Sequence, residues 1–332
     1  MSGYSLAREI RKQDKETPVL MVTADDGVSY SKPMLSTGFT KGKDADGLAQ
    51  GGTDAMADQL NVRIRTFATV TGIDTEAHEL ILGDERLAYS KLVLAWGADV
   101  IRLGLDGDGQ EHVFSINDLM DYRAFRDALG DGKRVAIMGA VQQELENLGV
   151  GFHLGTVVDR IDRRGDGVSL TLANGEALDA DLVLSAVGLR PRTDLAQAAG
   201  LETARGIVVN RALETSAPDV YALGDCAEVD GHVLLYVLPL MACSRALAKT
   251  LLGERTEVSY GTMPVMIKTP CCPTAVCPPP SAAEGNWEVE QDGTSVKALF
   301  KSAGGDVLGF AVTGSYAMEK QALSKEVPPI HG

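Results

Sequence analysis

The chain has 332 residues, with 31 basic against 46 acidic side chains and a formal net charge of −15 at pH 7. Its length predicts two or three domains. Hydrophobic residues make up 45% of the chain and charged residues 23%, a balance that excludes a disordered tail, a collagen-like repeat and a small disulfide scaffold. The acidic excess disfavours nucleic acids and anionic membrane surfaces as partners, because like charges repel.

Two further features concern the compartment. The longest nearly unbroken apolar run covers residues 233–243, whereas a helix that spans a bilayer needs about 20 residues, so we expect no membrane span. The first residues carry no apolar core of the signal-peptide type. The five cysteines are an odd number and all lie in the last third of the chain, which favours free thiols and a reducing, cytoplasmic location.

The first predicted elements are a helix and a buried strand. Apolar residues recur at helical spacing over residues 3–12, and the apolar run 18–23 is typical of a buried strand. Asp25 and Asp26 follow it. A helix, a strand and a polar strand end form the second half of a mononucleotide-binding βαβ unit. We therefore expect the first half of this unit, its strand and glycine-rich turn, to be missing before Gly3.

The next predicted elements lead to a second unit of this kind. They are a loop at 41–56, a helix at 56–61, a strand pair at 62–73 with its turn at Gly72, a buried strand at 91–97, a linker at 102–112 and a helix at 116–129. Residues 133–138 then form a strand that runs into Gly139, as at the start of a nucleotide-binding turn. The Gly-x-x-Gly continuation is absent, and an amphipathic helix over 141–149 takes its place.

The rest of the chain is predicted to return to sheet structure before a third section. The expected elements are a strand at 150–154, a meander with turns at 165–167 and 174–175, a buried strand at 182–188, short strands at 206–209 and 219–223, and a helix at 240–252. From about residue 258 the chain is rich in proline and in short predicted strands.

The strongest local signal is the string TSAPDVYALGDC at residues 215–226. Its strand delivers Gly224 and Asp225 to the start of a new segment. Gly224 has no Cβ, so a bulky ligand can approach the backbone there. The carboxylate of Asp225 can accept hydrogen bonds from the hydroxyl groups of a sugar alcohol.

This string resembles the second flavin motif of the FAD-dependent pyridine-nucleotide-disulfide oxidoreductase superfamily, and most of all its branch that reduces rubredoxin with NADH. The other segments that carry the resemblance are SYSKPMLS at 29–36, LVLAWG at 92–97, SAVGLRPRT at 185–193 and YVLPLM at 236–241. It implies an α/β fold with interleaved FAD- and NAD-binding Rossmann-like domains, both truncated here, and an α+β C-terminal section. The implied boundaries are 1–101 for the first FAD-binding part, 102–190 for the NAD-binding domain, 191–257 for the second FAD-binding part and 258–332 for the C-terminal section.

The resemblance also implies which residues contact FAD. The implied contacts are Thr23 and Ala24 near the adenosine ribose, Val70 beside the adenine, Asp225 at the ribityl chain, Lys32 in the loop beside the flavin, and Val237 and Lys268 near the isoalloxazine. A cation near the ring stabilises the anionic reduced flavin. Because the cofactor does the chemistry, we predict no catalytic side chain.

The electron acceptor follows from a missing motif. The redox-active Cys-x4-Cys pair of the family is absent, since no cysteine precedes Cys226. We therefore expect electrons from NADH to leave FAD directly for a one-electron acceptor such as an iron–sulfur protein, and the resemblance implies that this acceptor is rubredoxin or a similar small iron–sulfur protein. The resemblance further implies that the electrons serve alkane hydroxylase or oxygen-detoxifying enzymes, as they do for this branch in bacteria.

Basic residues and the remaining cysteines complete the predicted surface. Rubredoxin is usually acidic, so we expect a basic docking patch made by Lys32, Arg245, Lys268 and Lys320. The spacing of Cys271, Cys272 and Cys277 matches no zinc or iron–sulfur pattern, and we predict no metal site.

Two departures from the family pattern leave alternatives open. Only the last glycine of the FAD phosphate turn has a counterpart, Gly3, and about 40 residues of an ordinary NAD-binding unit are missing after Ala140. The chain is then an incomplete version of a working reductase or a degenerate paralogue. The alternative functions are a ferredoxin reductase of an oxygenase system and a non-catalytic remnant that keeps only a docking face.

Overall fold

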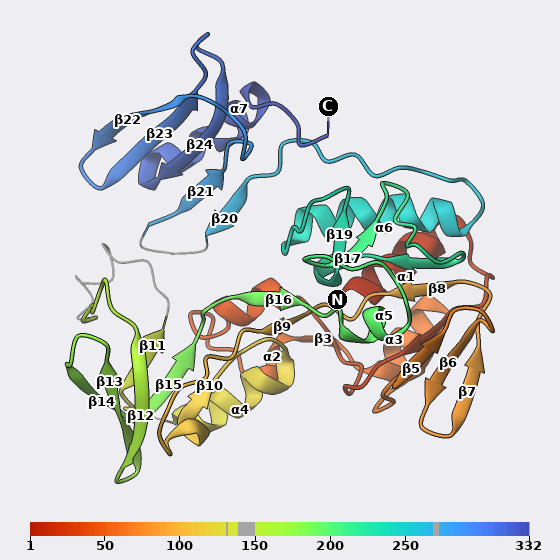
Figure 1. The fold of residues 1–332 in the computed structure, drawn as a ribbon, viewed down its shortest axis with the longest axis horizontal. Helices are drawn as coiled ribbons and strands as arrows, with labels where there is room; N and C mark the ends of the chain where they lie inside the picture. Colours follow the sequence, from red (N-terminus) through yellow and green to blue (C-terminus); the bar gives the residue numbers. More distant parts are fainter. Residues whose placement is uncertain (131, 139–149, 268–271, 332) are drawn as a thin grey trace.

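The structure is a computed structural model, and it describes residues 1–130, 132–138, 150–267 and 272–331. Figure 1 shows three groups of elements: one around α1, α6 and β8, a second around β10–β15, and a third formed by β20–β24 with α7. The α/β fold class expected from the sequence is confirmed.

The first group is built around two short parallel strand pairs. The pair β1 (Leu20–Val22) with β4 (Arg63–Arg65) and the pair β8 (Leu92–Leu94) with β18 (Val220–Ala222) share no hydrogen-bonded ladder. The other strands of this group are β2 (Ser29–Tyr30) with β3 (Ala49–Gly51), the antiparallel β5 (Gly72–Asp74), β6 (Glu79–Leu82) and β7 (Glu85–Ala88), and β17 (Ile207–Val209) with β19 (Ala227–Val229).

Helix α1 (Ser2–Gln13) joins two parts of the core. Leu6 and Ile10 enter the main apolar cluster, which also contains β18 and much of α6. Tyr4 and Ala7 enter a second cluster with α3. Burial on two sides explains why apolar residues recur so regularly along this helix. The other helices of the group are η1 (Lys32–Thr37), α2 (Ala45–Leu48), α3 (Thr53–Leu60), α5 (Asp194–Ala198), η4 (Gly224–Cys226) and α6 (Val237–Leu251).

The second group contains a parallel sheet and an antiparallel meander. The parallel sheet has the order β10 (Val113–Phe114), β15 (Leu182–Ser185), β11 (Val135–Met138), and the meander has the order β12 (Val158–Arg164), β13 (Gly167–Leu172), β14 (Ala177–Ala180). Two strands, β9 (Ala98–Val100) and β16 (Leu189–Pro191), pair where the chain enters and leaves this group. Its helices are η2 (Gln110–His112) and α4 (Leu119–Leu129).

The third group is a single antiparallel sheet with helices at its end. The strand order is β20 (Val265–Ile267), β21 (Thr274–Cys277), β24 (Val307–Thr313), β23 (Ser295–Lys301) and β22 (Asn286–Asp292). The helices are η5 (Gly314–Glu319) and α7 (Lys320–Glu326). Phe310 and Leu323 lie in its own apolar cluster, separate from the main core.

Three predictions for local elements were wrong. Residues 41–56 were predicted as a loop, but α2 and β3 lie within them. Gly72 does not form a turn, because it lies in β5 opposite Ile81, where a Cβ would come within 2.9 Å of the Ile81 side chain. Residues 150–154 form no strand, and Val150 and Leu154 are exposed. The helix predicted at 141–149 lies outside the described residues.

Candidate functional site

The loop after β1 folds back on α1. The hydroxyl group of Thr23 donates to Oδ1 of Asp25 at 2.6 Å, and the amide of Gly27 donates to the same oxygen at 2.9 Å. The hydroxyl group of Tyr4 on α1 donates to the Gly27 carbonyl at 2.5 Å. Ala24 lies exposed in this loop. The strand end that the sequence marked as polar therefore lies beside α1.

Two of the predicted residues form an ion pair across the first group. Lys32 opens η1 and Asp225 lies in η4, far apart in the sequence. Their Nζ and Oδ2 atoms are 3.6 Å apart, with side chains 28% and 19% exposed. Local pattern cannot predict this contact, because the two segments belong to different elements.

Gly224 lies where three elements meet. Its φ of +79° is a conformation that side chains rarely adopt, and a Cβ there would come within 2.6 Å of the Ser2 hydroxyl oxygen and 3.4 Å of Leu240 Cδ1. Ser2 begins α1 and Leu240 lies in the first turns of α6. Neither helix has a side-chain cap at its N-terminus. Uncapped amides and the helix dipole favour an anion at such a point.

Charged side chains from three segments act on the amino group at the start of α1. Burial lowers the pKa of the Met1 amino group, the carboxylates of Asp25 and Asp225 act in the opposite direction, and Lys32 adds to the lowering. All three side chains therefore lie within electrostatic range of one nitrogen at the N-terminal end of α1.

The thiol next to Asp225 is inert. Cys226 is fully buried, and burial raises the pKa of its thiol to about 12. Its Sγ donates to the Leu94 carbonyl at 3.4 Å, and the amides of Trp96 and Gly97 lie close enough to act on it. A protonated thiol offers no nucleophile and no thiolate for redox chemistry.

The remaining predicted residues lie on other elements. Val70 lies in the segment between β4 and β5 and packs against the main apolar cluster. Val237 is the first residue of α6, whose N-terminal turns reach Gly224. Lys268 lies outside the described residues. Sequence reasoning missed the organising role of Asp25, although a carboxylate directly after a buried strand was a signal for it.

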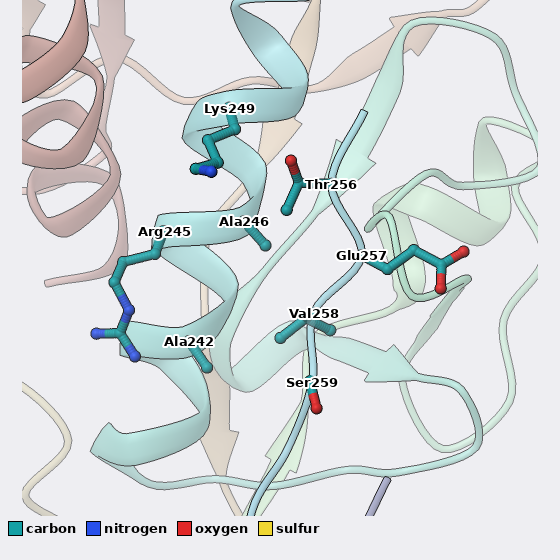
Figure 2. Close-up of a pocket in the computed structure, with 8 residues that line it drawn as sticks. All are labelled: Ala242, Arg245, Ala246, Lys249, Thr256, Glu257, Val258 and Ser259. Atoms are coloured by element: carbon teal, nitrogen blue, oxygen red, sulfur yellow. The ribbon is translucent and has the colours of Figure 1, made fainter. Parts of the chain in front are cut away.

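The first group also contains a pocket that is not lined by Gly224, Asp225 or Lys32. It has a volume of about 210 Å³ between α6 and residues 256–259, and Figure 2 shows Ala242 and Ala246 facing this segment. Arg245 lines this pocket, whereas Lys32 begins η1 and Lys320 begins α7. The basic patch therefore stays a prediction spread over three described elements.

Two other kinds of feature are absent from the described residues. Within these ranges, no cluster of three or more His, Cys, Asp or Glu could hold a metal ion, and no helix has the length and apolar character to cross a membrane.

Two family models match the chain. The model for pyridine nucleotide-disulphide oxidoreductases matches residues 1–141 and 140–249. The model described as the rubredoxin binding C-terminal domain matches residues 257–327. Together they cover all three groups of elements in the structure.

Relatives match over nearly the full length. A rubredoxin-NAD(+) reductase of Alcanivorax borkumensis is 49% identical over 370 aligned residues, which cover 99% of this chain and 97% of the relative. Its counterpart from Acinetobacter baylyi is 41% identical over 381 residues, covering 99% and 96%. Both alignments are longer than the 332-residue chain, so the relatives carry residues that this chain lacks.

A solved structure shows the same fold. The ferredoxin reductase for the CYP199A2 system from Rhodopseudomonas palustris has a TM-score of 0.84 and 21% identity, covering 98% of this chain and 93% of that one.

Proposed function

Because this chain belongs to the pyridine nucleotide-disulphide oxidoreductase family, we propose that it is an FAD-dependent oxidoreductase that transfers electrons from NADH to rubredoxin. The family model and the relatives named rubredoxin-NAD(+) reductase support the reaction, and the match to the rubredoxin binding C-terminal domain supports the acceptor. The likeness to a ferredoxin reductase is at 21% identity and supports only the fold, so rubredoxin is the acceptor that we favour.

The residues around Gly224 fit FAD. The uncapped start of α1 suits the pyrophosphate, because free amides and the positive end of the helix dipole both favour phosphate. Gly97 has a φ of +79°, and a Cβ at this position would meet no atom within 4 Å, so a planar ring can approach the backbone there. We place Thr23 and Ala24 near the ribose, Val70 near the adenine, and Val237 and Lys268 near the isoalloxazine.

Asp225 and Lys32 carry the most specific roles in this proposal. The carboxylate of Asp225 accepts hydrogen bonds from the ribityl hydroxyl groups, which are the donors that an ionised acceptor binds best. The ammonium group of Lys32, 3.6 Å from that carboxylate, balances its negative charge and places a positive charge beside the ring. When bound, FAD supplies the redox chemistry, accepting a hydride and releasing single electrons. No side chain is proposed as a general acid or base.

The domain organisation is part of the proposal. We assign residues 1–101 and 191–257 to FAD binding, 102–190 to NAD binding and 258–332 to the C-terminal section. The two matched family segments meet at 140–141, and the alignments to relatives are longer than the chain. Both facts support a NAD-binding unit that is shortened near residue 140, and we expect weaker NADH binding than a complete unit provides.

The pathway that the protein supplies and the compartment in which it works are also proposals. We propose that the acceptor serves alkane hydroxylation and that the protein works in the cytoplasm. Cys226, Cys243, Cys272 and Cys277 are unpaired in the structure, which supports a reducing compartment. Lys32, Arg245, Lys268 and Lys320 are proposed as the basic residues that meet an acidic rubredoxin.

The Lys32–Asp225 pair beside the uncapped α1 is the observation that carries this function. The test is anaerobic reduction of rubredoxin by NADH with the FAD-loaded protein, followed through the visible absorbance of rubredoxin and compared with ferredoxin. We expect faster reduction of rubredoxin. Faster reduction of ferredoxin would favour the alternative reductase. A protein that stays colourless after incubation with FAD, without bands at roughly 370 and 450 nm, would be the non-catalytic remnant.

A further inference from the structure

The chain passes twice between the first and second groups, and the two passages form a ribbon. It leaves through β9 and returns through β16, and Figure 1 shows the two strands side by side between the groups. They pair antiparallel, with Leu189 opposite Val100 and Pro191 opposite Ala98. A ribbon of only two strands is weak on its own. Its geometry therefore depends on what holds its ends.

One end of the ribbon is held by reciprocal hydrogen bonds between two side chains and two carbonyls. The indole Nε1 of Trp96 donates to the Arg192 carbonyl at 2.9 Å, and Nη1 of Arg192 donates to the Trp96 carbonyl at 2.9 Å. The guanidinium also donates through Nε to Oδ1 of Asp99 at 2.5 Å. We call these three residues the ribbon clasp.

The clasp is built for orientation more than for stability. The side chains of Arg192 and Asp99 are 44% and 56% exposed, and an exposed ion pair contributes only about 0–1 kcal/mol to folding. Trp96, in contrast, is partly buried against the main apolar cluster. The clasp thus fixes the end of β16 to a residue that packs against the core.

The anchored end leads directly to the proposed flavin site. The Sγ of Cys226 donates to the carbonyl of Leu94 at 3.4 Å, two residues before Trp96, and Cys226 follows Asp225 in the chain. At the same end of the ribbon, where Ala98 pairs with Pro191, the side-chain Nδ2 of Asn117 donates to the Ala98 carbonyl at 2.8 Å and ties β9 to the start of α4. The ribbon therefore links the second group to the backbone beside Asp225.

We propose that Arg192 is a positioning residue that, through Trp96 and Asp99, sets the orientation of the second group toward the flavin site. This inference rests on the proposed function, because the second group is the part assigned to NADH. Loss of the clasp leaves the flavin site and the C-terminal section intact, but it loosens the ribbon that presents NADH to the flavin.

The first experiment needs neither cofactor nor substrate. The amide of Ile101 donates to the Gly188 carbonyl at 3.0 Å and extends the ribbon to the residue before Arg102. Because trypsin binds residues on both sides of the cleaved bond, efficient cleavage at Arg102 requires this end of the ribbon to unpair, and mass spectrometry of the fragments reports its opening. We expect cleavage to be several-fold faster in Arg192→Ala and in Trp96→Phe, which keeps the ring but loses the donor. Arg190→Ala is the matched control, because Arg190 is exposed and, among the described residues, makes no side-chain hydrogen bond or ion pair. Equal cleavage in wild type and both clasp variants would overturn the proposal.

The second experiment separates the two half-reactions. In Arg192→Ala we expect flavin reduction by NADH to slow several-fold, while transfer from dithionite-reduced flavin to rubredoxin stays unchanged. Arg192→Lys should recover part of the rate, because an ammonium group still pairs with Asp99 but cannot donate to Asp99 and to the Trp96 carbonyl in the geometry of a guanidinium group. An equal loss in both half-reactions would contradict a positioning role. If the wild type cannot be reduced by NADH, the proposed function fails, and the cleavage at Arg102 still decides the role of the clasp.

Discussion

Gly224 and Gly97 offer a comparison that isolates the crowding at the start of α1. Both have a φ of +79°, but a Cβ at Gly224 meets Ser2 Oγ at 2.6 Å, whereas a Cβ at Gly97 meets no atom within 4 Å. The substitutions Gly224→Ala and Gly97→Ala therefore share the cost of the backbone conformation. They differ only in the contact with Ser2 and, more weakly, with Leu240.

The magnitudes follow from these two costs. A non-glycine residue at positive φ costs about 1–2 kcal/mol, and we expect this loss of unfolding free energy in Gly97→Ala. Forcing a methyl group into a packed contact adds about 1–3 kcal/mol. Gly224→Ala should therefore lose about 2–5 kcal/mol in total, a large part of a typical stability of about 5–15 kcal/mol.

Urea unfolding of the two variants without FAD measures the difference. We expect a lower midpoint for Gly224→Ala than for Gly97→Ala at the same slope, because the surface exposed on unfolding is unchanged. The double variant Ser2→Gly/Gly224→Ala should return to the stability of Gly97→Ala, since it removes the hydroxyl that the methyl group meets. Equal destabilisation by the two single substitutions would refute close packing of α1 on η4.

Three further predictions concern single side chains. Arg11 donates to four backbone carbonyls between α1 and the end of α3, so Arg11→Met should lower the unfolding free energy by about 2–4 kcal/mol in the same urea assay. Burial lowers the pKa of His331 from 6.5, so the unfolded state binds more protons below pH 6.5, and stability should fall as the pH drops through that window. His331→Phe, which keeps the stacking on Tyr260, should flatten this pH dependence of the thermal midpoint. At pH 8 an alkylating reagent should modify the partly exposed Cys272 but spare the buried Cys226, and peptide mapping that finds Cys226 modified would contradict its burial.

The elements that the sequence predicts well are those whose pattern is set by burial alone. Residues 3–12 and 18–23 correspond to α1 and β1, and the apolar runs at 91–97 and 182–188 contain β8 and β15. The turns at 165–167 and 174–175 join β12, β13 and β14 as expected. In each case the periodicity or the turn residues report a local requirement.

Elements whose form depends on a distant partner were predicted less well. Gly72 looks like a turn residue, but it is needed because the Ile81 side chain covers it. The hairpin of β6 and β7 was missed, although Gly83, with a φ of +63°, separates its strands and is a recognised hairpin signal. Helix α4 begins at Leu119, later than expected, because the Asp118 carboxylate caps it by accepting from the Asp121 amide.

The candidate site shows the same division. Local sequence alone places Gly224 and Asp225 at the end of β18, where we propose that a ligand binds. The resemblance placed Lys32 and Asp225 separately near the flavin, but their contact at 3.6 Å was not predicted, since no periodicity connects residues so far apart in the chain. The ribbon clasp escaped prediction for this reason too, because Trp96 and Arg192 are 96 residues apart in the sequence, with the second group between them.

FAD binding by wild-type protein and by Asp225→Asn tests the central claim most directly. Isothermal titration of the ligand-free chain with FAD should give one site per chain for the wild type. Asp225→Asn should bind at least tenfold more weakly, because the amide is a poorer acceptor for ribityl hydroxyl groups. Asp58→Asn, an exposed change on α3, should bind like the wild type. Equal FAD affinity in all three proteins, or no binding by the wild type, would contradict the account.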